Sequence, residues 1–289
     1  MSPLKKWTLR ILGGLAALLI VAVTTIYVMS ERTMARTYAL REVPITLPTD
    51  SASLARGAHL VELSCRGCHG PTMQGEVMFE EPGIARIVAP NVLDRLTKHS
   101  DSEFAGYMRY GVKKDGSTTF IMPPPGFYHM SDADLAAVIA YLRSQPIPAA
   151  IPLPANSFGP IGRMGIALGE FGTSVKYIDT TQMRVGADTA HLTTRRGEYM
   201  VRMICAECHG PKLTGDSAFK TPSLSVAVGY NLAQFTTLLR TGTPRDPATK
   251  LTMMAKAAQG TLKHLSDDEI AAIHGYLVAL PPTGVPGVK

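Results

Sequence analysis

The sequence predicts a mostly α-helical protein, in which an N-terminal transmembrane helix precedes two tandem copies of one helical domain joined by a long proline-rich linker. Three observations support this fold class. An apolar run near the N-terminus is long enough to cross a bilayer, a block of roughly 90 residues occurs twice, and neither copy shows a convincing strand-like alternation of apolar and polar residues. A length of 289 residues suits about two domains.

The apolar run covers residues 11–29 and contains no charged side chain. A helix of ~20 apolar residues crosses the hydrocarbon core once, so this run can act as a single-pass anchor. Three basic and no acidic residues precede it, which places the N-terminus in the cytoplasm by the positive-inside rule. We therefore expect a bacterial inner-membrane protein whose remaining domains are periplasmic. A cleaved signal peptide is the alternative, although residues 28–32 lack the small-residue cleavage site that it needs.

The internal repeat is visible at three places in each copy. Residues 56–71 recur as residues 196–211, and residues 131–135 recur as residues 266–270. Between these blocks, Phe104, Arg109 and Gly111 match Phe235, Arg240 and Gly242. Each copy ends in a predicted helix that begins with a serine cap and an acidic residue three positions later, the pattern of a capping box.

These matches divide the chain into segments. We expect a cytoplasmic N-terminus at 1–10, a membrane anchor at 11–29, a stalk at 30–49, a first domain at 50–145, a linker at 146–190, a second domain at 191–282 and a tail at 283–289. The linker is longer than an ordinary loop, and its first part is rich in proline, so we expect that part to be extended.

Each copy contains a Cys-x-x-Cys-His motif, and the two motifs account for all four cysteines. Two thiols three positions apart can form thioethers to the two vinyl groups of one porphyrin, and the adjacent histidine then becomes the proximal iron ligand. We predict two covalently bound haem c groups, with thioethers from Cys65, Cys68, Cys205 and Cys208 and with His69 and His209 on the iron atoms. A thioredoxin-like pair does not need the histidines, and a four-cysteine zinc site would require both copies to share one ion.

Methionine often occupies the sixth iron position of electron-transfer haems and raises their reduction potential. In the first copy, Met122 directly precedes three prolines, which fix the backbone and allow the loop to hold a sulfur over a flat cofactor. We prefer it to four other methionines of that copy, Met73, Met78, Met108 and Met130. In the second copy, Met253 and Met254 are adjacent, and the spacing from Gly242 selects Met253.

With these motifs, the two copies resemble class I c-type cytochromes. The resemblance rests on Gly57 and Gly197, eight residues before their first cysteines, on the Cys-x-x-Cys-His-Gly-Pro pattern and on a late Tyr-Leu pair. The Arg-x-Gly block and the Leu-Ser-Asp-Asp-Glu-Ile helix are similar to the haem domains of cytochrome c subunits of membrane-associated dehydrogenases. The resemblance implies that the first and last helices of each domain cross at the glycine, and that Met254 rather than Met253 is the second sixth ligand.

The second copy lacks the Met-Pro pair, and the chain has two attachment motifs where many such subunits have three. The predicted function is electron transfer between a membrane or periplasmic donor and an acceptor. The donor would be a dehydrogenase or a quinol-oxidising complex, and the acceptor a soluble cytochrome or a terminal oxidase. The chain would then be an electron carrier and not an enzyme. The alternative is a dihaem redox enzyme, peroxidase-like or thiosulfate-oxidising, with an open haem site in the second domain.

Charge argues against a nucleic-acid partner. The formal net charge is +6, but Lys5, Lys6 and Arg10 contribute three of these charges and precede the apolar run. The rest of the chain contains no run of five basic residues and no basic stretch interleaved with aromatic residues.

Overall fold

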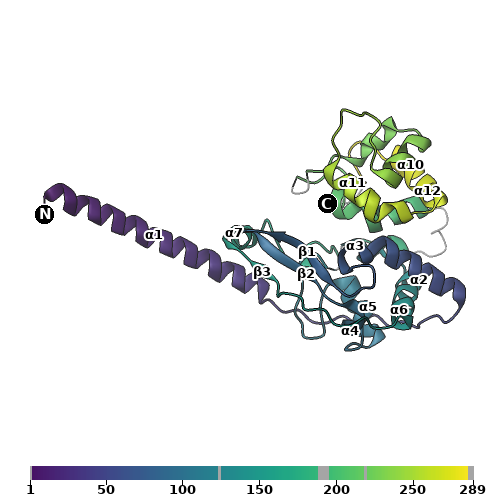
Figure 1. The fold of residues 1–289 in the computed structure, drawn as a ribbon, viewed down its shortest axis with the longest axis horizontal. Coiled ribbons are helices and arrows are strands. Elements are labelled where there is room, and N and C mark those ends of the chain that lie inside the picture. Colours follow the sequence, from purple (N-terminus) through teal and green to yellow (C-terminus); the bar gives the residue numbers. More distant parts are fainter. Residues whose placement is uncertain (1, 123–124, 188–194, 218–219, 286–289) are drawn as a thin grey trace.

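The computed structural model describes residues 2–122, 125–187, 195–217 and 220–285. The predicted boundary between linker and second domain, Pro123, Pro124 and the end of the tail lie outside these residues. A long N-terminal helix leads into a body made of two helical domains, with the second domain lying against the first (Figure 1).

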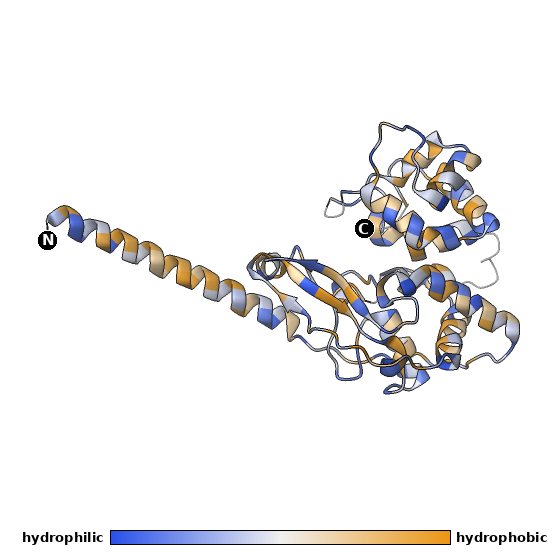
Figure 2. Cartoon of the chain, viewed as in Figure 1, coloured by the Kyte–Doolittle hydropathy of each residue, from blue (hydrophilic) through white to orange (hydrophobic). Residues whose placement is uncertain are grey.

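The N-terminal helix α1 spans Pro3–Met34 and extends beyond the predicted anchor at both ends. Ser2 caps it, and a proline occupies its first turn, where no intrahelical N–H partner is lost. Hydrophobic residues occupy most of its length (Figure 2), and their side chains are exposed. By length and composition, α1 is able to cross a membrane.

The first domain contains five α-helices, one 3₁₀ helix and a β-hairpin in the described residues. These are α2 (Ser51–Ser64), α3 (Arg66–His69), β1 (Glu76–Glu81), β2 (Ala85–Ala89), α4 (Val92–Leu96), α5 (Asp101–Tyr110), η1 (Pro125–His129) and α6 (Asp132–Ser144). A short strand of the linker, β3 (Ser157–Phe158), joins the hairpin in an antiparallel sheet of order β1-β2-β3. The hairpin adds a small sheet to the mostly helical fold. The sequence shows no clear alternation here, because β1 is exposed almost throughout and presents no buried face.

The second domain repeats the helical part. Its elements are α8 (Arg196–Met200), the π-helical turn η5 (Val201–Cys205), α9 (Ala206–His209), η6 (Leu224–Gly229), α10 (Leu232–Thr241), α11 (Thr252–Gly260), η7 (Leu262–His264) and α12 (Asp267–Val278). At the place of the hairpin, its described residues form a single bridge between Asp216 and Thr221.

In each domain, the first and last helices cross at a glycine. A Cβ atom at Gly57 would lie 2.0 Å from the carbonyl oxygen of Ala137, and a Cβ atom at Gly197 would lie 2.1 Å from that of Ala272. Since no side chain fits in this space, glycine is required where α2 meets α6 and where α8 meets α12. The expectation drawn from the family resemblance is confirmed at both crossings.

The segments on either side of the first domain pack against it. In the stalk, the backbone N–H of Tyr38 donates to Gly116 and that of Val43 donates to Ser102. Residues 146–156 have no regular structure, as expected for the proline-rich part of the linker, but helix α7 (Pro160–Leu168) and two 3₁₀ turns, η2 (Ser174–Lys176) and η3 (Val185–Ala187), follow. Both segments therefore pack against the first haem domain.

Candidate haem-binding sites

The first attachment motif lies in the turn between α2 and α3. Cys65 ends α2, where its N–H donates to Val61, and its carbonyl oxygen then accepts from the N–H groups of Cys68 and His69. Gly70 terminates this turn with a φ of +79°. The short helix therefore fixes both cysteines and the histidine on one small backbone unit.

The second motif has the same local backbone, but a different helix leads into it. Gly210 ends α9 with a φ of +76°, as Gly70 ends α3. The last turn before the cysteines is a π-helix in the second domain and an α-helix in the first. π-Helical turns inside helices occur frequently at functional sites.

Both histidines are held by a proline carbonyl. Nδ1 of His69 lies 2.8 Å from the carbonyl oxygen of Pro90, and Nδ1 of His209 lies 2.9 Å from that of Pro222. A carbonyl oxygen can only accept, so Nδ1 carries the proton and the lone pair of Nε2 is left for a metal. Burial lowers the pKa of both imidazoles, partly opposed by these hydrogen bonds, and keeps them in the neutral form that a metal requires.

The four cysteines form no disulfide with one another, and burial raises the pKa of each thiol. The pKa rises to about 11 for Cys65 and to about 12 for Cys205, the two that begin the motifs. A redox-active Cys-x-x-Cys pair needs a lowered pKa on its attacking thiol, so the thioredoxin-like alternative does not fit. Paired neutral thiols beside a histidine with one free nitrogen fit covalent haem attachment.

The sixth-ligand candidate of the first domain lies in a loop whose backbone is fixed by hydrogen bonds. Met122 is half-buried and packs against the hydrophobic core. Its carbonyl oxygen accepts hydrogen bonds from the hydroxyl groups of Tyr107 and Thr119, and its N–H donates to Phe120. The loop backbone is therefore anchored on both sides of the thioether.

The structure distinguishes the two adjacent methionines of the second domain. Met254 is half-buried and packs against the core, whereas the side chain of Met253 is 46% exposed. Both lie in the first turn of α11 and not in a proline-fixed loop. The side-chain positions therefore favour Met254.

The buried methionines of the first domain have apolar counterparts in the second. Met73, Met108 and Met130 are almost fully buried, and the repeat places Leu213, Leu239 and Leu265 at the same positions. Leucine has no ligand atom and fills the same volume. These three methionines are therefore packing residues of the shared core.

The two attachment sites lie close to the boundary between the domains. A Cβ atom at Gly67, inside the first motif, would lie 3.1 Å from the hydroxyl oxygen of Thr261. Burial is the main cause of the raised pKa of Cys68, and the charges of Glu207 and Cys208 from the second motif add to it. Helix η1, which follows the Met122 loop, contacts both η5 and α9.

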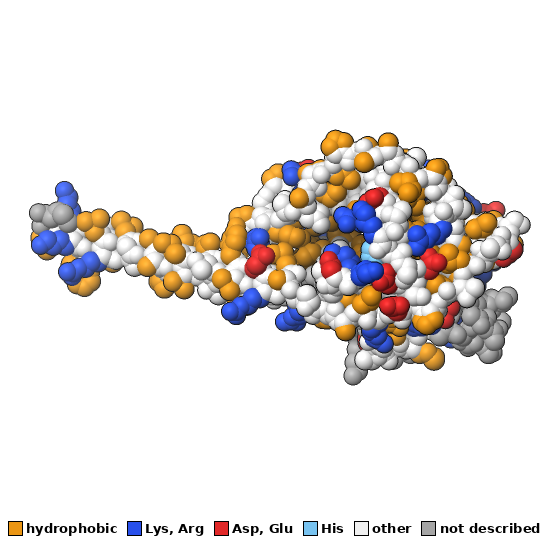
Figure 3. Space-filling view, turned by 90° about the horizontal axis from the view of Figure 1, so that it is seen from below, with side chains coloured by type: hydrophobic (Ala, Val, Ile, Leu, Met, Phe, Trp, Pro, Cys, Tyr) orange, Lys and Arg blue, Asp and Glu red, His pale blue; other side chains and the backbone are white. Residues whose placement is uncertain are grey.

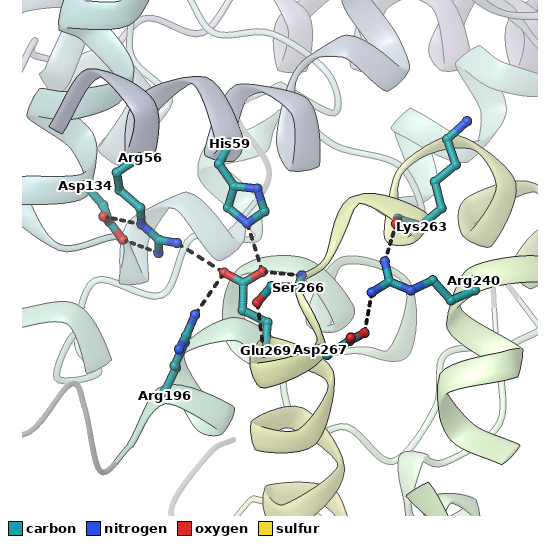
Figure 4. A network of polar contacts seen from close by, with 9 residues as sticks. All are labelled: Arg56, His59, Asp134, Arg196, Arg240, Lys263, Ser266, Asp267 and Glu269. Carbon is teal, nitrogen blue, oxygen red and sulfur yellow. Dashed lines mark hydrogen bonds and ion pairs between the residues drawn. The ribbon is translucent and has the colours of Figure 1, made fainter. Parts of the chain in front are cut away.

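Glu269 of α12 is the centre of the polar contacts between the domains (Figure 4). Its carboxylate lies 3.1 Å from Nη1 of Arg56 and 2.8 Å from Nε2 of His59, both on α2. Arg196 approaches to 3.5 Å, and the N–H of Ser266 donates to the same carboxylate. Burial alone would raise the pKa of Glu269, but the hydrogen bonds from His59 and Ser266 and the charge of Arg56 outweigh it and lower the pKa to about 2.

A second contact between the domains joins α8 of the second domain to α6 of the first. The hydroxyl of Tyr199, on α8 of the second domain, donates to the carboxylate of Asp134 at 2.8 Å and accepts from the N–H of Ser131 at 3.0 Å. The repeat aligns Tyr199 with His59 and Asp134 with Glu269. In both directions, therefore, the first helix of one domain binds the carboxylate three residues after the serine cap of the other domain's last helix, which is the geometry of a pseudo-twofold interface. The predicted capping box forms at Ser266 and Glu269, whereas at Ser131 the hydroxyl of Tyr199 takes the place of the acidic side chain.

Sequence reasoning missed Pro90 and Pro222, which orient the proximal histidines. They follow their histidines by 21 and 13 residues, because the hairpin is inserted between them in the first domain only. No fixed spacing was available to reveal them. The role of Glu269 between domains was also missed, because the sequence showed it only as a capping-box residue.

Two helical domains, each with a paired-thiol attachment turn, a carbonyl-oriented histidine and a core-packed methionine, define a dihaem electron-transfer protein. The cytochrome c family model matches residues 54–146 and 195–281, more than half of the chain. The chain belongs to the cytochrome c family, and its two domains bind two covalently attached haem c groups.

Relatives with known roles are subunits of dehydrogenases. The cytochrome c subunit of the quinone alcohol dehydrogenase of Gluconobacter oxydans (strain 621H) is 25% identical over 269 residues, covering 80% of this chain and 55% of the relative. The gluconate 2-dehydrogenase cytochrome c subunit of Pantoea cypripedii is 28% identical over 275 residues, covering 80% and 60%. The fructose dehydrogenase cytochrome subunit of Gluconobacter japonicus is 23% identical over 260 residues, covering 79% and 53%. This chain spans a little more than half the length of these relatives.

Proposed function

We propose that this chain is the electron-transfer subunit of a membrane-associated dehydrogenase, passing electrons from a substrate-oxidising partner towards an acceptor of the respiratory chain. The observation that carries the proposal is the pair of equivalent attachment sites, each with a histidine held for metal binding, that lie close to one interface between the domains. The dehydrogenase relatives support a donor of this class.

The residues have separate roles in this proposal. Cys65 and Cys68, and in the second domain Cys205 and Cys208, hold the haem groups, which when bound supply a reversible one-electron change at iron. His69 and His209 bind iron through Nε2, while Pro90 and Pro222 fix their orientation. Met122 and Met254 are the proposed sixth ligands, and the packed interface keeps the two sites at a fixed separation.

The proposed location is a bacterial inner membrane, with α1 as the anchor. The basic residues before the apolar run support a cytoplasmic N-terminus and periplasmic haem domains. Haem attachment to thiols also suits an exported chain. We retain the boundaries 50–145 and 191–282 for the two haem domains, with a soluble cytochrome or terminal oxidase as final acceptor.

The first experiment records spectra of the reduced, purified full chain before and after addition of carbon monoxide. Neither haem should bind the gas, because a methionine sulfur completes both coordination shells. Binding at a single haem that Met254→Leu does not increase would identify an open site in the second domain. That result would favour the dihaem redox enzyme over the electron carrier as the function of this chain.

The partner is tested in membranes of cells that lack this chain. Dehydrogenase activity measured with an artificial dye should persist there, while oxygen uptake driven by the same alcohol, sugar or sugar acid should be lost and should return with the gene. Unchanged oxygen uptake with every such substrate would exclude the proposed place between dehydrogenase and oxidase.

A further inference from the structure

Helix α7, in the segment between the haem domains, has apolar side chains on two faces. Gly162 and Ile166 are buried against the first domain, where a Cβ atom at Gly162 would lie 2.1 Å from the carbonyl oxygen of Ile84. Ile161, Met164 and Leu168 occupy another face, at positions i, i+3 and i+7, and are 56%, 42% and 71% exposed. A short helix in water normally presents polar residues on its exposed face, so this face is unusual for a surface helix.

The one charged residue of α7 is bound to α1. Nη1 of Arg163 lies 3.1 Å from the hydroxyl oxygen of Ser30 and 3.0 Å from the carboxylate of Glu31, and the guanidinium group lies 4.7 Å from the ring centre of Tyr27. Ser30 is the one buried residue of α1. Helix α7 is therefore fixed to α1 at the outer end of the apolar run, and its exposed face carries no charge.

The position of α7 along α1 determines whether its exposed face lies in water or in lipid. The apolar run ends at residue 29, so the contacts at Tyr27, Ser30 and Glu31 lie where α1 would leave the hydrocarbon core. In Figure 1, α7 is seen nearly end-on beside the outer end of α1, and so it runs across the direction of α1. Hydrophobic side chains continue from α1 onto the adjoining part of the body (Figure 3).

We propose that α7 lies in the outer lipid–water interface, with Ile161, Met164 and Leu168 inserted among lipid chains, as a second membrane contact beside α1. The proposal rests on α1 spanning the bilayer. A helix parallel to the membrane with an apolar face gains free energy from the apolar area that it buries in the headgroup and acyl region. Continuity with the spanning helix favours lipid over a protein partner, because lipid already surrounds α1 at this depth.

The second contact would also fix the orientation of the first haem domain. The rings of Phe158, before α7, and Phe171, after it, lie 4.6 and 6.3 Å from the ring of Phe120 in the Met122 loop. The N–H of Ser174 donates to Thr119 of the same loop at 2.8 Å. A membrane-bound α7 would therefore hold this loop at a constant height above the bilayer.

Spin-label accessibility tests the proposal in the full chain in lipid vesicles. The haems occupy all four native cysteines, so Leu168→Cys provides a single labelling site. Two matched sites are Leu19→Cys in the middle of α1 and Ala248→Cys on an exposed loop of the second domain. Collision rates with oxygen, which is concentrated in lipid, and with a polar nickel chelate are measured with both haems reduced.

Labels at 168 and 19 should collide with oxygen several-fold more often than the label at 248, and with the chelate less often. If position 19 shows the lipid pattern and position 168 the aqueous one, α7 lies outside the membrane and the proposal is wrong, although the anchor stands. A label at 168 that is shielded from both reagents would show a protein partner on this face, which also overturns it. If position 19 is aqueous, α1 does not span the bilayer and the anchor itself fails.

Discussion

The two haem domains share one helical core but differ in what surrounds it. The first carries the hairpin, the stalk, α7 and a proline-bounded Met122 loop, whereas the second has a π-turn before its cysteines and its methionines on a helix. The residues that hold the proximal histidine are the same in both. The attachment side of the site is therefore fixed by the shared core, while the sixth-ligand side differs between the domains and can give each haem its own potential.

Removal of either cysteine pair should produce the largest change, the loss of one covalent haem. The double variants Cys65→Ala/Cys68→Ala and Cys205→Ala/Cys208→Ala should each bind one covalent haem per chain in place of two, because each pair serves its own site. Pyridine haemochrome spectra and haem staining of denaturing gels measure the stoichiometry. Retention of two covalent haems by either variant would contradict the assignment.

Substitution of the proposed sixth ligands tests the difference between the domains directly. Met122→Leu and Met254→Leu should each lower the potential of one haem by on the order of 0.1 V, within the ~0.8 V range that axial ligation spans. Met253→Leu is the matched control and should leave both potentials unchanged, since its side chain is exposed. Potentiometric titration resolves the two haems, and a shift in Met253→Leu without one in Met254→Leu would reverse the choice.

Loss of Glu269 should weaken the contact between the domains. In Glu269→Gln, Arg56 keeps its two hydrogen bonds to Asp134, but Arg56 and His59 both lose the carboxylate of Glu269. Loss of these charged hydrogen bonds should destabilise the packed domains by ~2–3 kcal/mol. Asp268→Asn, on the neighbouring exposed position of the same helix turn, is the control. Thermal unfolding measures the difference, and equal stability of the two variants would show that the contacts of Glu269 contribute little to the stability of the chain.

The pH dependence of this contact has a defined sign. The pKa of Glu269 is about 2 in the folded chain and 4.5 without these contacts, so its contribution is complete above pH 4.5 and is lost as the pH falls towards 2. Between those values the wild-type chain should lose more stability than Glu269→Gln. If the free energy of unfolding fell equally with pH in the wild-type chain and in Glu269→Gln, protonation of Glu269 would not break stabilising contacts in this pH range.

The smallest effect is expected at the reciprocal contact. Tyr199→Phe removes the hydroxyl that accepts from Ser131 and donates to Asp134, which should cost about 1–2 kcal/mol through unsatisfied buried groups. Tyr177→Phe, in an exposed linker position, serves as a control. If Tyr199→Phe destabilised the chain as much as Glu269→Gln, the two halves of the interface would carry equal weight.

Much of this architecture could be predicted from the sequence because the repeat appears twice. The attachment motifs, the serine-capped last helices and the crossing glycines are local patterns, and each copy confirms the other. Pro90 and Pro222 could not be found, since their contribution is a backbone carbonyl at unequal spacing. The hairpin was missed because β1 faces solvent, and the packing of the linker depends on contacts with α1 that no local pattern encodes.

The reciprocal contacts of His59 and Tyr199 have a consequence for assembly. A contact in which each unit gives the other the same surface closes on itself after one rotation. Each domain uses its single copy of this surface on its neighbour, and so no copy remains to recruit a third. Any further haem domain or redox partner would therefore have to bind through a different face.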